Sequence, residues 1–282
     1  MNDVKDIMHK PITINKDSQI SDAIKQLVQH NISRLLVSEN SHIVGIVTEK
    51  DIGLLLFADE TDRKIDEIPI VEVLKPLATV YESVPIRDSS KIMLDKEVGS
   101  LAVESKGQIL GIFTKTDLVK YYADNYEGKK KVRDSMTRSY VMMYSDKPLY
   151  KIVSKMLEKK ISRIFLKNYD NAAEGIITFR DLFKISLDYG IDSVMEDNTR
   201  PDISLVLHRR GFVSKSGFGE VTPASKVMTR TLVTVLEDTD LAEACEILLR
   251  NKINGVGVVS NLGKLIGVLS KTDVVNTMSL LN

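Results

Sequence analysis

The sequence is poor in the residues on which most metal, redox and base-stacking sites depend. Its one cysteine, Cys245, has no second cysteine for a disulfide within the chain, which is typical of a reducing compartment. The four histidines are far apart and have no metal-ligand spacing (His9, His30, His42 and His208). Tryptophan is absent, and the seven phenylalanines and nine tyrosines do not suggest an aromatic platform for single-stranded nucleic acid. We therefore expect no metal site.

An excess of charge of either sign is also lacking. Lysine plus arginine and aspartate plus glutamate both number 39, which argues against a general nucleic-acid or membrane-surface binder. The longest apolar run, about residues 52–58, is far shorter than the ~20 residues of a membrane-spanning helix. No signal segment, nucleotide P-loop, nucleophile elbow or zinc-protease motif is present. We expect a cytoplasmic protein with no catalytic residues and no direct nucleic-acid or membrane partner.

What the sequence does contain is one short motif in four copies. Each copy reads Gly, two apolar residues, Thr or Ser, two variable residues and Asp. The copies are GIVTEKD (Gly45 to Asp51), GIFTKTD (Gly111 to Asp117), GIITFRD (Gly175 to Asp181) and GVLSKTD (Gly267 to Asp273). Internal repeats of this kind indicate that the whole chain is built from one recurring unit.

The residues around each copy predict that unit. A short β-like segment comes first, as in residues 11–14. A helix follows, with apolar residues at i, i+3, i+4, i+7 and i+8, as in residues 20–28. Two apolar strands joined by a polar turn come next, and a second helix starts after the Thr or Ser. The order is β-α-β-β-α, an α/β (α+β) fold. In the second copy Ser89 and Ser90 occupy core-facing positions, so we expect that helix to pack least well.

Two interpretations of the motif are open. Ser or Thr followed three residues later by an acid is a helix capping box, and Asp in the first turn suits the helix dipole. The same atoms suit a nucleotide, because a helix N-terminus favours phosphate and a carboxylate can accept from the two hydroxyls of a ribose. Capping alone does not explain why Asp appears every time, or why Gly always precedes the Thr or Ser by three residues.

The unit resembles the CBS domain (the cystathionine β-synthase repeat), whose ribose-phosphate motif is similar to all four copies. The stretches DIMHKPITI, VRDSMTRSYVMM and SKVMTRTLVTV are similar to that family's lead-in. The resemblance covers nearly the whole chain and implies repeats at about 4–57, 71–122, 132–187 and 224–279. It also implies pairing of the repeats into two Bateman modules, 1–127 and 128–282, the second with an insertion at 188–223.

The resemblance also implies site residues, in clefts between paired repeats that take adenine nucleotides. The expected phosphate or ribose contacts are Thr48, Thr114, Thr178 and Ser270, and the expected ribose contacts are Asp51, Asp117, Asp181 and Asp273. Arg34 and Arg163 are similar in position to arginines that meet phosphate in the AMP-activated kinase γ subunit, with Ser33 and Ser162 in place of its histidine. The second and fourth copies have Ser100 and Gly255 instead. The arginines could also be solvated residues at a strand edge. Within the motifs, Lys50, Lys115, Arg180 and Lys271 could add positive charge for a phosphate, or could be solvated residues in the first turn of exposed helices.

The resulting hypothesis is a regulatory CBS protein that requires no cofactor and senses AMP, ADP, ATP or another adenosine derivative. Occupancy would be transmitted to the arrangement of the modules, in one chain or a homodimer, or to an unidentified regulated protein. A ligand-independent interaction scaffold and a regulator of a separate transcription factor are the alternatives. The insertion could be a flap over a ligand, a docking loop or an inert excursion.

Overall fold

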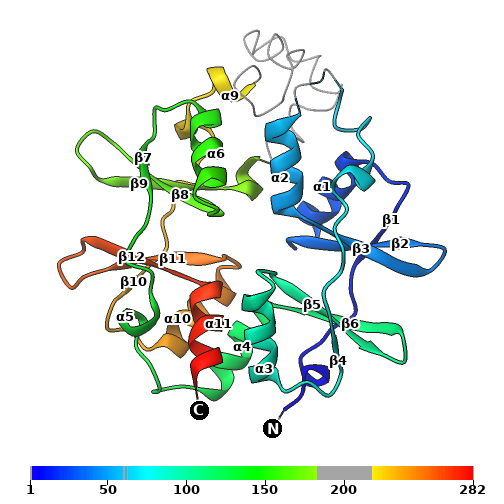
Figure 1. The fold of residues 1–282 in the computed structure, drawn as a ribbon. Coiled ribbons are helices and arrows are strands. Elements are labelled where there is room, and N and C mark those ends of the chain that lie inside the picture. The colour runs from blue at the N-terminus through cyan, green and yellow to red at the C-terminus, as the bar shows by residue number, and fades with distance from the viewer. Residues whose placement is uncertain (1, 60, 62, 183–217, 282) are drawn as a thin grey trace. The chain divides into compact units, whose positions relative to one another are not determined.

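The computed structural model describes residues 2–59, 61, 63–182 and 218–281, which form four three-stranded sheets with their helices (Figure 1). Most of the insertion at 188–223 therefore lies outside the described residues. Its last part contains the short helix α9 (Phe218–Val221). The remaining short helices precede the first strand of each repeat: η1 (Val4–Asp6), η2 (Ile70–Val73), α5 (Val132–Ser135) and η4 (Ala224–Lys226).

The order β-α-β-β-α recurs in every repeat, as predicted. The first repeat contains β1 (Thr13–Asn15), α1 (Ile20–Gln29), β2 (Arg34–Glu39), β3 (His42–Thr48) and α2 (Glu49–Ala58). The second contains β4 (Thr79–Tyr81), α3 (Ile86–Asp95), β5 (Ser100–Ser105), β6 (Gln108–Thr114) and α4 (Lys115–Asn125).

The third repeat contains β7 (Met142–Tyr144), α6 (Leu149–Glu158), β8 (Arg163–Lys167) and β9 (Ala173–Thr178), followed by helical residues 179–182. The fourth contains β10 (Thr234–Leu236), α10 (Leu241–Arg250), β11 (Gly255–Val259), β12 (Leu265–Ser270) and α11 (Lys271–Leu280).

All four sheets have the same mixed topology. The first strand runs parallel to the second, with Ile14 opposite Val37 in the first repeat, and the second runs antiparallel to the third, with Leu36 opposite Ile46. The parallel pair needs a crossover, which the first helix of each repeat supplies. Every hairpin shifts register near its turn, between Val37 and Ser38 in the first repeat. A register shift of this kind bends the hairpin, so that its outer strand does not present a flat edge to which another chain could pair.

The first helix of each repeat buries the predicted apolar face. In α1, Ile20, Ala23, Ile24 and Leu27 are fully buried. Cys245 lies on the same face of α10 and is also fully buried; desolvation raises the pKa of its thiol to about 12. A thiol that stays protonated is a poor nucleophile, so Cys245 acts as a small core residue.

The two serines of helix α3 are buried and hydrogen-bonded. Ser89 and Ser90 are fully buried, and α3 packs against α11. Both hydroxyls donate to the carbonyl oxygen of Ile86, at 2.6 and 3.4 Å, so neither is left without a hydrogen bond. The expectation that α3 packs less well than the first helices of the other repeats stays a prediction.

The described chain divides into two compact units. Unit 1 comprises Met1–Pro11, Leu77–Tyr140 and Val233–Asn282, and unit 2 comprises Ile12–Pro76 and Val141–Leu232. Unit 1 thus holds the second and fourth sheets and unit 2 the first and third. Each unit has its own hydrophobic core. The predicted modules 1–127 and 128–282 group the repeats differently, by chain order, and stay a prediction.

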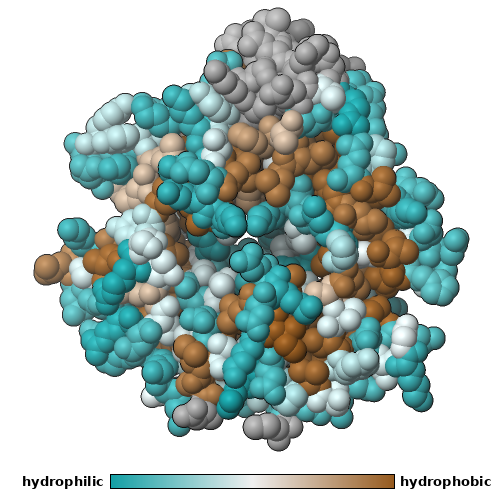
Figure 2. All heavy atoms as spheres, in the orientation of Figure 1, coloured by the Kyte–Doolittle hydropathy of each residue, from teal (hydrophilic) through white to brown (hydrophobic). Residues whose placement is uncertain are grey.

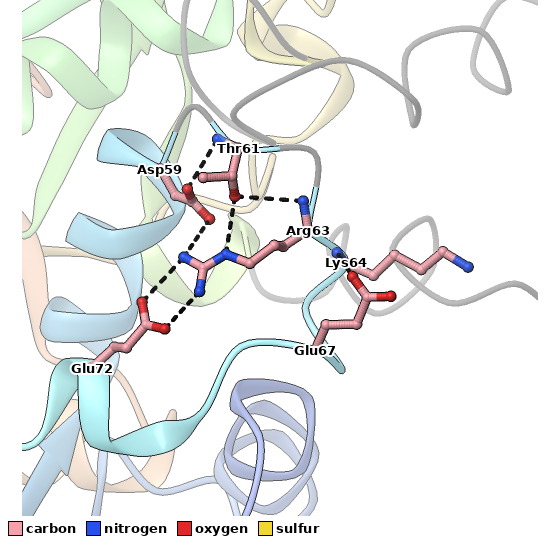
Figure 3. Close-up of polar contacts among 6 residues, drawn as sticks. All are labelled: Asp59, Thr61, Arg63, Lys64, Glu67 and Glu72. Carbon is pink, nitrogen blue, oxygen red and sulfur yellow. Dashed lines mark hydrogen bonds and ion pairs between the residues drawn. The ribbon is translucent and has the colours of Figure 1, made fainter.

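The segment that follows α2 is held in place by buried apolar residues, by backbone hydrogen bonds and by an ion pair. Ile65 and Ile68 are buried, and their carbonyl oxygens accept from the backbone N–H groups of Ser21 and Ile20 at the start of α1. Arg63, in the same segment, donates hydrogen bonds to both carboxylate oxygens of Glu72, at 2.6 and 3.2 Å, as Figure 3 shows. The carbonyl oxygens of Ile65 and Ile68 thus accept from N–H groups at the start of α1 that have no partner within that helix.

No helix among the described residues is both long and apolar enough to cross a membrane. The face shown in Figure 2 has hydrophilic areas with hydrophobic areas between them.

Candidate functional site

The glycine of each motif lies against another segment of the chain. In unit 2, Gly45 faces Leu74 and Lys75, and a Cβ at Gly45 would lie 2.6 Å from the carbonyl oxygen of Lys75. The next residue, Ile46, exchanges two backbone hydrogen bonds with Lys75, of 3.0 and 2.9 Å. A side chain at this position would push the two backbones apart. The glycine is therefore required for close approach, which capping alone did not explain.

The same contact occurs at all four motifs. We call residues 8–9, 74–75, 136–137 and 228–229 the approach segments, because each precedes the first strand of one repeat and pairs with the third strand of another. A Cβ at the other three motif glycines would lie 2.7 to 3.0 Å from the carbonyl oxygens of His9, Thr229 and Thr137. The pairs are His9 with Ile112, Lys75 with Ile46, Thr137 with Val268 and Thr229 with Ile176.

The motif aspartates cap their own helices, as the capping interpretation predicts. Thr114, Thr178 and Ser270 each donate their backbone N–H to the aspartate three residues later, at 2.7 to 2.8 Å. The Thr or Ser hydroxyl donates to the same carboxylate oxygen in all four copies, at 2.6 to 2.9 Å. These contacts occupy one oxygen, Oδ2, of each aspartate.

The approach segments distinguish the four aspartates. Thr229 donates its hydroxyl to Asp181 Oδ1 at 2.8 Å, and Thr137 donates to Asp273 Oδ1 at 2.8 Å. At Asp117 the corresponding residue is His9. At Asp51 it is Lys75, and no hydrogen bond joins these two in the described chain. The motif residues alone did not reveal these partners; the recurring Met-Thr and Met-His pairs in the lead-in stretches carried the signal.

The His9–Asp117 pair joins a histidine of an approach segment to a motif aspartate. Burial by itself would raise the pKa of Asp117, but hydrogen bonds from His9 and Thr114 outweigh it and hold that pKa below its ordinary value. The bond to Asp117 raises the pKa of His9 above its ordinary value, against the effect of burial. Each group therefore favours the charged form of the other.

The two predicted arginines lie beside motif residues, both in unit 2. Strand pairing places Arg34 opposite Thr48 and Arg163 opposite Thr178. Each guanidinium donates to the preceding serine, Arg34 to Ser33 at 3.0 Å and Arg163 to Ser162 at 3.4 Å. The structure thus brings together Ser33, Arg34, Thr48 and Asp51 in the first repeat and Ser162, Arg163, Thr178 and Asp181 in the third.

Unit 1 has a different set of cations. Ser100 and Gly255 occupy the places of the arginines, opposite Thr114 and Ser270. Lys115, inside the second motif, donates to the hydroxyl of Thr272 in the fourth, and Lys271 donates in return to Thr116, both at 2.9 Å. Lys271 is buried, so it is not the solvated residue that its place in a first turn suggested.

A family model described as the CBS domain matches residues 4–54, 65–124, 132–188 and 224–280. The chain belongs to the CBS domain family. Each matched segment contains one motif and one sheet, so the four CBS repeats expected from the sequence are confirmed.

Relatives of similar length come from archaea. The chain is 22% identical over 282 residues to the protein MJ1225 of Methanocaldococcus jannaschii, with 94% of each chain covered. It is 24% identical over 279 residues to a 33.4 kDa protein from the ribosomal RNA operon of Thermofilum pendens, covering 94% of this chain and 87% of that protein. The crystal structure of MJ1225, described as a candidate archaeal homolog of g-AMPK, matches with a TM-score of 0.79 at 20% identity and covers 98% of this chain and 99% of its own. That likeness shows the same CBS fold.

Proposed function

We propose that this CBS protein senses adenine nucleotides and has a regulatory rather than a catalytic role. The observation that carries the proposal is the pairing of a hydroxyl and a carboxylate at the start of the helix in all four motifs. The helix N-terminus and the hydroxyl suit a phosphate, and the carboxylate suits ribose hydroxyls. The description of the MJ1225 structure as a homolog of g-AMPK agrees with a nucleotide-responsive subunit.

The four sites are not equivalent in this proposal. The first and third have an arginine beside the Thr, and the second and fourth have lysines from neighbouring motifs. At the third and fourth, Thr229 and Thr137 occupy the second carboxylate oxygen, so a ribose would have to displace them. We expect the first site, where Asp51 has no such hydroxyl partner in the described chain, to bind AMP, ADP or ATP most tightly.

The proposal groups the repeats into Bateman modules in chain order, 1–127 and 128–282. The approach segments support this grouping. The segment ahead of the first strand of the first repeat pairs with the second repeat, and the segment ahead of the first strand of the second repeat pairs with the first. The third and fourth repeats exchange their approach segments in the same way. A bound nucleotide would join a motif to the approach segment of its partner repeat and so change how the modules, a second copy of the chain or a regulated protein dock.

Titration of the full chain tests the proposal. AMP, ADP, ATP, S-adenosylmethionine and coenzyme A are added separately in calorimetry and thermal-shift measurements. A ligand that binds only the folded state at 100 times its dissociation constant stabilises it by about 2.7 kcal/mol. Asp51→Ala, Asp117→Ala, Asp181→Ala and Asp273→Ala are then compared with Asp88→Ala, which removes an exposed first-turn aspartate of α3 outside the motifs.

The proposal expects loss of binding in motif variants and no loss in Asp88→Ala. No binding to the unaltered chain at millimolar ligand would disprove it.

The second candidate function is a ligand-independent scaffold. One observation favours it: Asp181 is buried and accepts hydrogen bonds from Thr178 and Thr229, so the motif already has a structural role without ligand. The two functions differ in one result. A scaffold predicts that each motif variant lowers the melting temperature equally with and without nucleotide.

A further inference from the structure

One ion pair in unit 2 joins the first motif to the third. Arg180, inside the third motif, donates its Nε to Glu49 Oε1 at 2.7 Å, and its Nη2 lies 2.6 Å from the same oxygen. Arg180 Nη2 also donates to the carbonyl oxygen of Ile32 at 3.1 Å, and Nη1 donates to Asn31. The side chains are 22% and 12% exposed, so the pair is largely shielded from water. Glu49 is the first residue of α2, directly after Thr48.

The neighbouring residue of the third motif strengthens this junction. Phe179 is buried and lies against Gly53 of α2, where an added Cβ would be 2.4 Å from its ring. The two motifs are therefore held together by a close apolar contact as well as by the ion pair. In unit 1 the equivalent junction uses lysine and threonine, from Lys115 to Thr272 and from Lys271 to Thr116. Among the four copies of the motif, Glu49 is the only acid that directly follows the Thr or Ser.

Glu49 also lies next to the first-repeat arginine. Its backbone N–H donates to the carbonyl oxygen of Ser33 at 3.0 Å, and strand pairing places Arg34 opposite Thr48. Burial raises the pKa of the Glu49 carboxyl, while Arg180 and then Arg34 favour its ionised form. The carboxylate thus shares the positive field of two arginines, at the place where a phosphate is expected.

We infer that Glu49 determines the specificity of the first-repeat site by limiting how much phosphate charge that site accepts, and that Arg180 is the positioning residue that holds it there. The inference rests on the proposed nucleotide function. A phosphate beside Arg34 would lie close to a carboxylate held in a shielded position, where like charges repel more strongly than in water. Each further phosphate adds repulsion, so the site favours adenosine or AMP over ATP. Loss of the ion pair between Glu49 and Arg180 would also remove a contact that holds the third motif, which contains Arg180.

The test measures a ratio of affinities. Calorimetry on the full chain gives dissociation constants for adenosine, AMP, ADP and ATP, and the first-repeat site is identified as the one lost in Asp51→Ala. Glu49→Gln removes the charge but keeps an oxygen that can accept from Arg180. We expect its affinity for ATP relative to adenosine to rise about tenfold, which corresponds to about 1.4 kcal/mol. Arg180→Gln leaves the Glu49 charge without this partner, and we expect the same ratio to fall.

The opposite directions separate specificity from structure. If the ion pair only stabilised the fold, both variants would lose the same ion pair. The affinity for ATP relative to adenosine would then stay at the wild-type value in each variant. Glu127→Gln, an exposed residue in the link after α4, controls for the change in net charge. A ratio within twofold of wild type in Glu49→Gln, or shifts of the same sign in the two variants, overturns the inference. Should Glu49→Gln not fold, Arg180→Gln alone decides, since an unchanged ratio there also overturns it. Failure of the unaltered chain to bind any of the four ligands would instead disprove the proposed function.

Discussion

His9 Nε2 lies 3.5 Å from Asp117 Oδ2, so a residue ahead of the first strand of the first CBS repeat takes part in the helix cap of the second repeat. The third and fourth motifs place a threonine hydroxyl at the equivalent point. A histidine there makes the contact depend on pH, because its charge changes near neutrality while that of a hydroxyl does not.

The stability from this pair should be greatest in mildly acidic solution. The folded-state pKa of His9 is raised above 6.5, so its contribution is fully present below that value and is lost as the pH rises through the raised pKa. The pKa of Asp117 is lowered below 3.8, so its contribution is lost only as the pH falls through that lowered value. Because His9 is half exposed, we expect an effect of at most about 1 kcal/mol.

Urea unfolding at pH 5.5 and pH 8 measures this effect. The wild type should lose more stability between these values than His9→Gln does, while His42→Gln, exposed in the first hairpin, should follow the wild type. An identical pH dependence in His9→Gln and wild type would contradict the prediction.

Gly53→Ala should destabilise the protein, although alanine normally favours a helix by about 1 kcal/mol over glycine. The reason is the ring of Phe179, which a Cβ at Gly53 would meet at 2.4 Å. We expect a loss of about 1–3 kcal/mol, as for other overpacked sites. Thermal unfolding of Gly53→Ala, Phe179→Ala and the double variant tests the contact. The two losses should not add, and additive losses would show that the residues do not interact.

Asp181→Ala should cost more stability than Asp51→Ala when no ligand is present. Asp181 is buried and accepts from the Thr178 backbone and hydroxyl and from Thr229, whereas Asp51 accepts from the Thr48 hydroxyl. Loss of a buried acceptor leaves its donors unsatisfied, at about 1–3 kcal/mol, and loss of a simple cap costs about 1 kcal/mol. Urea unfolding of both variants gives the comparison, with Asp88→Ala as the reference. A larger loss of stability in Asp51→Ala than in Asp181→Ala would contradict the prediction.

Tyr122→Phe should leave the stability unchanged or raise it by up to about 1 kcal/mol. Tyr122 is fully buried in α4, its hydroxyl has no hydrogen-bond partner among the described residues, and burial raises its pKa. Removing a buried polar group that makes no bond removes its desolvation cost. Tyr121→Phe, on the same helix but partly exposed, should show no such gain. A loss above about 1 kcal/mol in urea unfolding of Tyr122→Phe would indicate that the hydroxyl does make a bond.

The recurring unit could be read from the sequence because its signals are local. These signals are the apolar strands joined by a polar turn, the helical spacing of Ile20 to Leu27 and the three-residue step from Thr48 to Asp51. Each depends on residues that are close together in the chain. A local inference that was wrong concerned Lys271. Its place in a first helical turn suggested a solvated side chain, but Lys271 is buried and donates to Thr116 of another repeat, a partner that only folding brings near.

The sequence by itself determined the four CBS repeats, the order of their elements and the Thr or Ser and Asp at each helix start. These follow from propensities and caps that each repeat carries within its own residues. Only the tertiary structure decided which segments meet: His9 with Asp117, Thr229 with Asp181, and Arg180 with Glu49. Such contacts join residues far apart in the chain, and their energy comes from charge and shape that match only after folding. Gly, Thr or Ser, and Asp recur in every copy of the motif, but their long-range partners differ from copy to copy.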